Sequence, residues 1–221
     1  MERPTPNTAL VFNASFPGQQ SGRAFERFTE NGPLAVLPLQ TLGHTDQRYN
    51  VVWSVSNSTA TTFGDLDDEA FRNHFQDAFG WRLGRVQAVG RRSHWPLMRL
   101  SASEQFRAGF LLVGNAAHTL HPVAGQGLNL SLREAGLLAQ AIADAQQRSA
   151  AIGCLASLKT YLDQVSDEQR LVVDSTDALA TLFNRRGPLL DVPRDASLAL
   201  LDLLPAIRQQ VASVGTGRRY A

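Results

Sequence analysis

One loop contains the residues whose types and spacing could support chemistry. It runs from Gly114 to Leu130 and has no Asp, Glu, Lys or Arg. Asn115 follows a short apolar run typical of a strand, so it stands at the carboxyl end of that strand, where open α/β sheets bind ligands. Further along, Gly125-Gln126-Gly127 opens a predicted helix, and its glycines leave backbone N–H groups accessible because they have no Cβ. A helix N-terminus carries about half a positive charge, so the loop predicts a site for a group that carries or develops negative charge.

Other interpretations of this loop are weaker. A Gly-x-Gly pair is common at helix starts. The dinucleotide-binding fingerprint is not formed, because Leu130 takes the place of its third glycine and a loop precedes Gly125. His118 and His121 lie three residues apart, but the loop has no Cys, Asp or Glu to complete a metal site. We therefore predict no metal and interpret both histidines as hydrogen-bonded structural residues.

Outside the loop, the sequence favours neither of two possible catalytic arrangements. Asp65, Asp67, Asp68 and Glu69 could form an acidic catalytic cluster, but they fit better as favourable charges at a helix N-terminus. A hydrolase triad has no support, because the sequence has no Gly-x-Ser-x-Gly motif. The sequence therefore assigns no side chain as a general acid or base.

The composition restricts the class of protein. The 221 residues, 43% of them hydrophobic, suffice for one large or two small domains. A net charge of +1 gives no electrostatic reason to expect nucleic acid as a partner. Cys154 is the single cysteine, which excludes an intrachain disulfide and favours a reducing compartment. Residues 108–132 lack charged side chains over a length that could span a bilayer, but their Asn, His and Gln residues argue against a membrane span.

Residues 1–105 have the pattern of a β-rich layer with one covering helix. Asn31-Gly32 between two apolar runs is typical of a hairpin turn. The helix is predicted to begin with Asp65 as its cap and to end at Gly80. Trp95-Pro96 is expected to end the last strand. The predicted strands are residues 8–16, 23–28, 34–39, 49–56 and 85–94.

The rest of the chain is mainly helical. In residues 106–150, the apolar run 110–114 is consistent with a strand buried on both faces, and a helix follows over 128–145. Residues 151–221 predict a helical tail, in which Ser157 caps a helix that reaches Phe183 and a second piece covers 195–211. The expected buried stripe of the first helix is Leu128, Leu132, Ala135, Leu138 and Ile142. That of the second is Leu158, Leu162, Val165, Gln169, Val172, Thr176, Leu179 and Phe183.

Two stretches resemble a known family. The sequence from Leu112 to Leu130 resembles the second flavin-contact motif of class A flavoprotein monooxygenases, and within them the ubiquinone-biosynthesis hydroxylases, such as those acting on 2-polyprenyl-6-methoxyphenol. The stretch from Glu26 to Leu39 resembles the same subgroup. The resemblance implies an α+β fold. A mainly antiparallel substrate-domain sheet with a covering helix would be followed by the returning strand and helices of an incomplete FAD-binding, Rossmann-like domain and by the helical tail.

The resemblance also implies a set of cofactor-binding residues. In the wider family, an Asp that holds the flavin ribityl chain stands at the position of Asn115, so Asn removes a negative charge there. The chain from Pro122 to Gly127 would pass beside the isoalloxazine ring. Ser131 and Glu134 stand where the family often has Gly and Asp, and we expect them to alter local packing. The implied cofactor-binding residues are Gly114, Asn115, Pro122, Gly125, Gln126, Gly127, Leu128 and Asn129.

The activity implied by the resemblance is hydroxylation of a polyprenylated phenol, with FAD as cofactor and NAD(P)H and O2 as co-substrates. The strand–Gly-x-Gly-x-x-Gly–helix unit that binds the ADP moiety of FAD in this family does not occur here, so we expect a carboxyl-terminal portion that is inactive by itself. We expect a cytoplasmic location with peripheral contact to the inner membrane, and either self-association or a place in a ubiquinone-biosynthesis protein complex. Two alternatives stay open: a hydroxylase of a soluble aromatic compound, and a non-catalytic helical interaction module.

Overall fold

The computed structural model describes residues 2–18, 22–40, 47–120 and 125–184. The chain divides into two compact units, Met1–Ser103 and Glu104–Ala221. The predicted helical piece over 195–211 lies outside the described residues. Among the described helices, none combines the length and the apolar character that crossing a bilayer requires.

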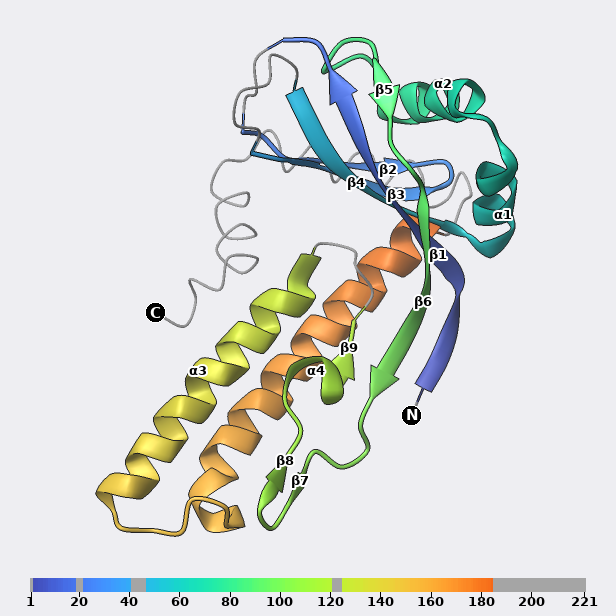
Figure 1. Ribbon diagram of the computed structural model, residues 1–221. Helices are drawn as coiled ribbons and strands as arrows, with labels where there is room; N and C mark the ends of the chain where they lie inside the picture. The colour runs from blue at the N-terminus through green and yellow to red at the C-terminus, as the bar shows by residue number, and fades with distance from the viewer. Residues whose placement is uncertain (1, 19–21, 41–46, 121–124, 185–221) are drawn as a thin grey trace. The chain divides into compact units, whose positions relative to one another are not determined.

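The first unit is built on an antiparallel sheet. Its strands are β1 (Glu2–Phe16), β2 (Phe25–Thr29), β3 (Gly32–Pro38), β4 (Gln47–Ser56), β5 (Ala88–Val89) and β6 (Ser93–Ser101). They lie in the order β2-β3-β4-β1-β6, and β5 also pairs with β1 (Figure 1). Across the sheet, Trp53 of β4 stands opposite Leu10 of β1 and Leu34 of β3. The predicted hairpin is confirmed, because β2 and β3 are joined directly before Gly32.

Two helices cover one face of this sheet, α1 (Asn57–Asp65) and α2 (Asp68–Phe79) (Figure 1). The core between sheet and helices is rich in aromatic rings. Phe12 of β1 meets Phe71 and Phe75 of α2 edge-on, with ring centroids 4.9 Å and 5.2 Å apart. Such contacts contribute about 0.5–1.5 kcal/mol each beyond the buried area. The aromatic core therefore fixes α2 against the sheet.

The predicted helix cap and the predicted number of helices are wrong. Asp65 ends α1, and the cap of α2 is Asp67, whose Oδ1 accepts the Ala70 N–H at 2.7 Å. Sequence patterns missed α1 because its Asn-Ser-Thr-Ala-Thr-Thr run has low helix propensity. The cap of α1 is Ser56, whose Oγ accepts the Thr59 N–H at 3.1 Å. The predicted end of α2 at Gly80 is confirmed.

The last predicted strand of this unit also needs correction. Residues 85–94 do not form one strand, because β5 ends at Val89 and β6 begins at Ser93. Pro96 lies inside β6 and does not end it. It stands opposite Thr8, next to a shift in the β1–β6 register between Pro4 and Thr8. A proline has no N–H for the ladder, and such irregular pairing is where a strand tolerates one.

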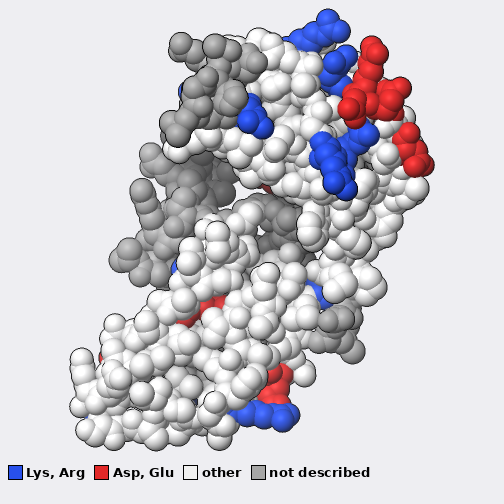
Figure 2. All heavy atoms as spheres, in the orientation of Figure 1, with Lys and Arg blue, Asp and Glu red and all other residues white. Residues whose placement is uncertain are grey.

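Charged side chains gather over α1 and α2. Figure 2 shows acidic and basic groups standing next to one another there. Asp68 and Glu69 lie in the first turn of α2, as the interpretation of the acidic cluster predicts. Arg92 binds Asp68 at 3.0 Å and lies over the Phe71 ring. These contacts account for the acidic residues without a catalytic role.

The second unit contains a helical hairpin and several short elements. The elements are β7 (Phe106–Arg107), β8 (Phe110–Leu111), the 3-10 helix η1 (Gly114–Ala116), β9 (His118–Thr119), α3 (Gln126–Gln147) and α4 (Leu155–Asn184). The helices α3 and α4 lie side by side (Figure 1). Strand β8 pairs with β7. The α+β class is confirmed, but the described residues of this unit do not show a Rossmann-like parallel sheet.

The predicted buried strand over 110–114 is wrong. Phe110 is 60% exposed, and β8 has two residues. A strand buried on both faces needs sheet neighbours on both sides. Within the described part of this unit, β7 is the neighbour of β8, so the apolar run has no such surroundings.

The buried face of α3 also differs from the predicted stripe. Leu128 and Leu132 are 70% and 62% exposed, whereas Leu130, Glu134 and Ala145 are buried. The last two residues of the predicted stripe are half-buried, so the prediction is wrong in the first half of the helix and holds in part beyond it. In that first half, a carboxylate, Glu134, lies in the interior.

The stripe predicted for α4 is confirmed in its first half. Leu158, Val165 and Gln169 are buried, together with Tyr161. Ser157 does not cap the helix, which begins at Leu155; its Oγ donates to the carbonyl oxygen of Ala151 at 2.8 Å. The side chains beyond Val172 lie outside the described ones.

Candidate functional site

The first part of the candidate site is the turn η1. Gly114 has a φ of +61°, a left-handed conformation that glycine adopts without strain. A Cβ at this position would lie 3.1 Å from the Ser131 Oγ, so α3 leaves little room for a side chain. The Ala117 N–H closes the turn by donating to the Gly114 carbonyl at 2.9 Å. The turn presents Asn115, whose side chain is exposed.

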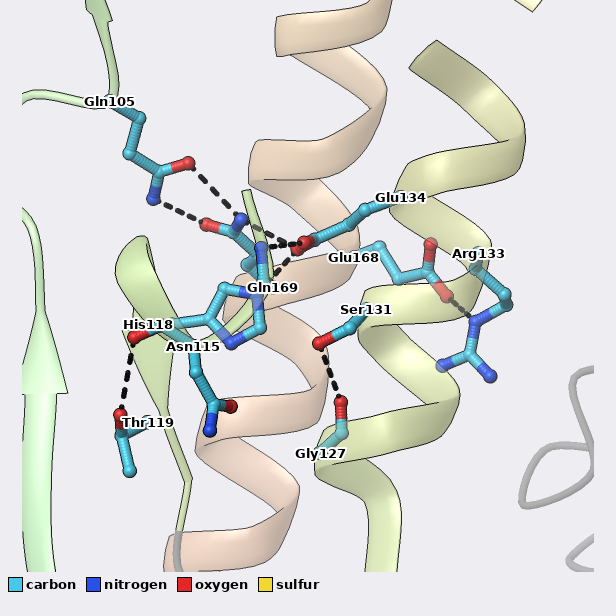
Figure 3. A network of polar contacts seen from close by, with 11 residues as sticks. Gln105, Asn115, His118, Thr119, Gly127, Ser131, Arg133, Glu134, Glu168 and Gln169 are labelled. Atoms are coloured by element: carbon cyan, nitrogen blue, oxygen red, sulfur yellow. Dashed lines mark hydrogen bonds and ion pairs between the residues drawn. The ribbon is translucent and has the colours of Figure 1, made fainter. Parts of the chain in front are cut away.

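A buried carboxylate on α3 holds this turn. The Gly114 N–H donates to Oε2 of Glu134 at 3.0 Å. Nε2 of His118 lies 2.6 Å from Oε1 of Glu134, and Nε2 of Gln169 donates to the same oxygen at 2.8 Å. Glu134 is 0% exposed and His118 is 3% exposed. Figure 3 shows these side chains converging between α3, α4 and the turn.

The electrostatic state of Glu134 follows from these contacts. Burial by itself would raise the pKa of the carboxyl group. Hydrogen bonds from His118, Gln169 and the Gly114 N–H outweigh burial, so the pKa of Glu134 is lowered. A carboxylate accepts hydrogen bonds and donates none, so Nε2 of His118 carries the proton between them.

The second part of the candidate site is the N-terminus of α3. Gly125 is the N-cap, with a φ of +58°, and no side chain within the described ranges caps this end of the helix. A Cβ at Gly125 or Gly127 would meet no described atom within 4 Å. Leu128 and Asn129 in the first turn are exposed. The first N–H groups of a helix have no partner within it, so this end can donate to a ligand.

The predicted site residues can be located as follows. Gly114, Asn115, Gly125, Gly127, Leu128 and Asn129 lie at the two places just described. Pro122 and His121 lie outside the described residues, as does the side chain of Gln126. The structural interpretation of His118 is confirmed by its contact with Glu134. Among the described residues, no group of three His, Cys, Asp or Glu side chains could hold a metal ion.

Sequence reasoning missed Glu134, Gln169 and Gln105 as a polar network. Gln105 and Gln169 exchange two hydrogen bonds between their amides, at 2.8 Å and 3.2 Å. A sequence signal existed for Gln169, because it is a polar residue at a position of α4 that helix periodicity predicts to be buried. The buried stripe predicted for α3 does not include Glu134, so periodicity did not point to this residue.

The comparison with protein families decides the family. The model of a family described as "FAD binding domain" matches residues 7–176. The chain belongs to this FAD-binding family. Its relatives include the ubiquinone hydroxylase UbiL of Rhodospirillum rubrum, 33% identical over 177 residues, which cover 80% of this chain and 40% of the relative. The 3-demethoxyubiquinol 3-hydroxylase of Escherichia coli is 27% identical over 95% of this chain and 52% of its own length. The chain thus spans about half the length of the curated relatives that it matches.

Two solved structures show the same fold at low identity. The p-nitrophenol 4-monooxygenase PnpA of Pseudomonas putida matches with a TM-score of 0.65 and 17% identity, over 91% of this chain and 49% of that one. A PqsL variant of P. aeruginosa matches with a TM-score of 0.64 and 22% identity, over 83% and 50%. The family model and the relative from Rhodospirillum rubrum show homology to flavin-dependent hydroxylases, and membership of the family implies FAD as the cofactor of its members.

The residues present fit a flavin in their chemistry. The N-terminus of α3 offers backbone donors beside open space at Gly125 and Gly127. The positive end of the helix favours a ring that becomes negative when it is reduced. The exposed amide of Asn115 can both donate and accept hydrogen bonds.

Proposed function

We propose that this chain forms the isoalloxazine-binding part of an FAD-dependent hydroxylase that acts on a polyprenylated phenol in ubiquinone biosynthesis. The observation that carries the proposal is the helix end at Gly125, which the described residues neither cap with a side chain nor cover, within a chain of the FAD-binding family. The named relatives from Rhodospirillum rubrum and Escherichia coli, hydroxylases of ubiquinone or its precursor by their names, support the substrate class.

In this proposal, the chain's own residues bind and orient the cofactor. The α3 N-terminus donates N–H groups to the polar edge of the ring system, and Asn115 binds the ribityl chain from the turn η1. When bound, FAD supplies the redox chemistry, with NAD(P)H as reductant and O2 as the source of the hydroxyl oxygen. Pro122 and Gln126 belong to the same proposed binding set.

The experiment is a chimera in which this chain replaces the matching half of the Rhodospirillum rubrum relative. We expect the purified chimera to retain FAD and to consume O2 with NAD(P)H and a prenylated phenol. Gly127→Leu should abolish FAD retention, because the side chain would fill the space beside the amides. Gly136→Leu is the matched control: it lies on the same helix, and its Cβ would also meet no described atom within 4 Å. A folded chimera without FAD would contradict the proposal.

A hydroxylase of a soluble aromatic compound is the competing proposal within the same class. It predicts that O2 consumption is equal or faster with a short, soluble phenol than with the prenylated one.

The proposed polyprenyl substrate also implies a cytoplasmic enzyme in peripheral contact with the inner membrane, alone or in a complex. Sedimentation of the chimera with vesicles of anionic and neutral phospholipid tests that contact.

A further inference from the structure

The carboxylate of Glu134 joins three segments that are far apart in sequence. Its acceptor atoms bind the N–H that begins η1, the ring of His118 that follows η1, and an amide on α4. A buried charge is tolerated where donors of this kind compensate it. The two ends of the turn are therefore held by one side chain.

This arrangement determines where Asn115 stands. Asn115 lies between Gly114 and His118, the two residues bound to Glu134. Its backbone carbonyl accepts a bond from the Thr119 hydroxyl at 3.4 Å, which also stabilises the turn. No hydrogen bond from the Asn115 side chain joins it to other described residues, and the amide extends away from Glu134 (Figure 3). Its place therefore follows from the backbone of η1.

Glu134 also fixes the tautomer and orientation of His118. Because the carboxylate accepts from Nε2, that nitrogen carries a proton. Nδ1 is buried and has no hydrogen-bond partner among the described residues. It faces the side of Asn115 and Ser131 (Figure 3). Without Glu134, the His118 ring would lose the hydrogen bond that selects the tautomer protonated at Nε2.

Gln169 connects this arrangement to α4. One proton of its amide binds Glu134 and the other binds Gln105, while its oxygen accepts from Gln105. Among the described residues, these hydrogen bonds of Gln169 reach neither Gly114 nor Asn115. A substitution of Gln169 would therefore act on the turn through Glu134.

We propose that Glu134 is the positioning residue of the segment 114–118, and that Gln169 orients Glu134 from α4. The consequence for cofactor binding rests on the function proposed above. The role of Glu134 in holding the turn does not, and it is measurable on this chain without flavin.

The experiment compares two neighbouring residues of α4. Gln169→Leu removes the bond to Glu134. Glu168→Gln is the matched control. It removes the charge of an ion pair between Glu168 and Arg133 of α3, and this pair makes no hydrogen bond to the turn among the described residues. We expect amide hydrogen exchange at Gly114 to rise about tenfold in Gln169→Leu and to stay within about twofold of the wild-type rate in Glu168→Gln. Equal rates in the two variants, raised or unchanged, would overturn the proposal.

The second measurement is the nitrogen-15 NMR spectrum of the His118 ring. In the wild-type chain we expect a proton on Nε2, from which the Glu134 carboxylate accepts a hydrogen bond. Glu134→Gln should give a mixture of tautomers, because the amide can donate as well as accept, and Glu134→Asp should retain the wild-type tautomer. The opposite tautomer in the wild-type chain would overturn the proposal even if every variant failed to fold.

A flavin measurement separates this proposal from the proposed function. In the chimera, Gln169→Leu should weaken FAD affinity about tenfold and Glu168→Gln should leave it unchanged. If the unsubstituted chimera binds no FAD, the proposed function fails, and the exchange and NMR measurements still decide the role of Glu134. If FAD affinity is unchanged in Gln169→Leu while Gly114 exchanges faster, the link between the turn and the cofactor is overturned.

Discussion

Oε1 of Glu134 lies 2.6 Å from Nε2 of His118, and both side chains are almost completely shielded from solvent. The contact joins the buried face of α3 to His118, which directly follows the turn η1. A buried pair of this kind adds little net stability compared with an apolar replacement of both partners, but removing one partner leaves the other uncompensated. This asymmetry makes the pair a sensitive place to test the structure.

Removing the Glu134 carboxylate should destabilise the chain strongly. We expect Glu134→Ala to lower the free energy of unfolding by about 3–5 kcal/mol, because Gly114, His118 and Gln169 would each lose a buried acceptor. Urea unfolding at pH 7 measures the change. The control is Glu104→Gln, which removes the charge of an exposed pair with Arg107 and should produce no measurable change. A similar stability of both variants would contradict the buried network.

The lowered pKa of Glu134 predicts how stability depends on acid. The unfolded carboxyl group titrates near about 4.3, and the folded one titrates below that value. Its contribution to stability is therefore fully present above about pH 5 and is lost as the pH falls through the folded pKa. Between about pH 5 and pH 3, the free energy of unfolding should fall more steeply for the wild-type chain than for Glu134→Gln. Parallel curves for the two proteins would count against the assigned shift.

Tyr161 predicts a second dependence, at alkaline pH. Burial, followed by the charge of Glu134, raises the pKa of its phenol to about 12. An unfolded tyrosine ionises near about 10, so the folded state loses stability as the pH rises above that value. We expect Tyr161→Phe to flatten the fall of unfolding free energy between about pH 10 and pH 12. In Glu134→Gln, ultraviolet titration should show Tyr161 ionising at a lower pH than in the wild-type chain.

The first unit was predictable from sequence because its signals are local. The β-branched and aromatic run of β4, the Asn31-Gly32 turn and the Gly80 stop each specify an element by itself. The helix α1 was not predictable, since its polar run is helical only when Ala60 and Phe63 pack into the core.

The site was predictable only in part. The glycines at 125 and 127 identify the helix start, because their chemistry is backbone chemistry. The role of Glu134 depends on contacts with residues 16, 20 and 35 positions away, and helix periodicity does not encode them. The burial of Leu130 in place of Leu128 likewise depends on tertiary packing, which decides which apolar residues of a helix are covered.

The corrected cap of α2 gives a paired test. Asp67→Ala should lower the free energy of unfolding by about 1 kcal/mol, because the Ala70 N–H loses its acceptor. Asp65→Ala should change it much less, since that residue ends α1 and does not cap α2. Thermal unfolding of the two variants at one pH gives the comparison. A larger effect at Asp65 would restore the sequence-based assignment of the cap.

Gly32 tests the hairpin between β2 and β3. Its φ is +123°, and a Cβ there would lie 2.1 Å from the backbone oxygen of Ser54. An alanine would have to displace β3 from β4, because a backbone oxygen cannot turn away as a side chain can. Gly22 is the matched control: its φ is +67°, but a Cβ there would meet no described atom within 4 Å.

We expect Gly22→Ala to cost about 1–2 kcal/mol from backbone strain alone. Gly32→Ala should cost roughly 1–3 kcal/mol more than that, since strain and the clash with Ser54 add. Urea unfolding followed by fluorescence of the buried Trp53, which pairs with β3 at Leu34, reports directly on this part of the sheet. If Gly32→Ala were no worse than Gly22→Ala, the close approach of β3 to Ser54 would be wrong, and with it the register that aligns Leu34, Trp53 and Leu10 in the core.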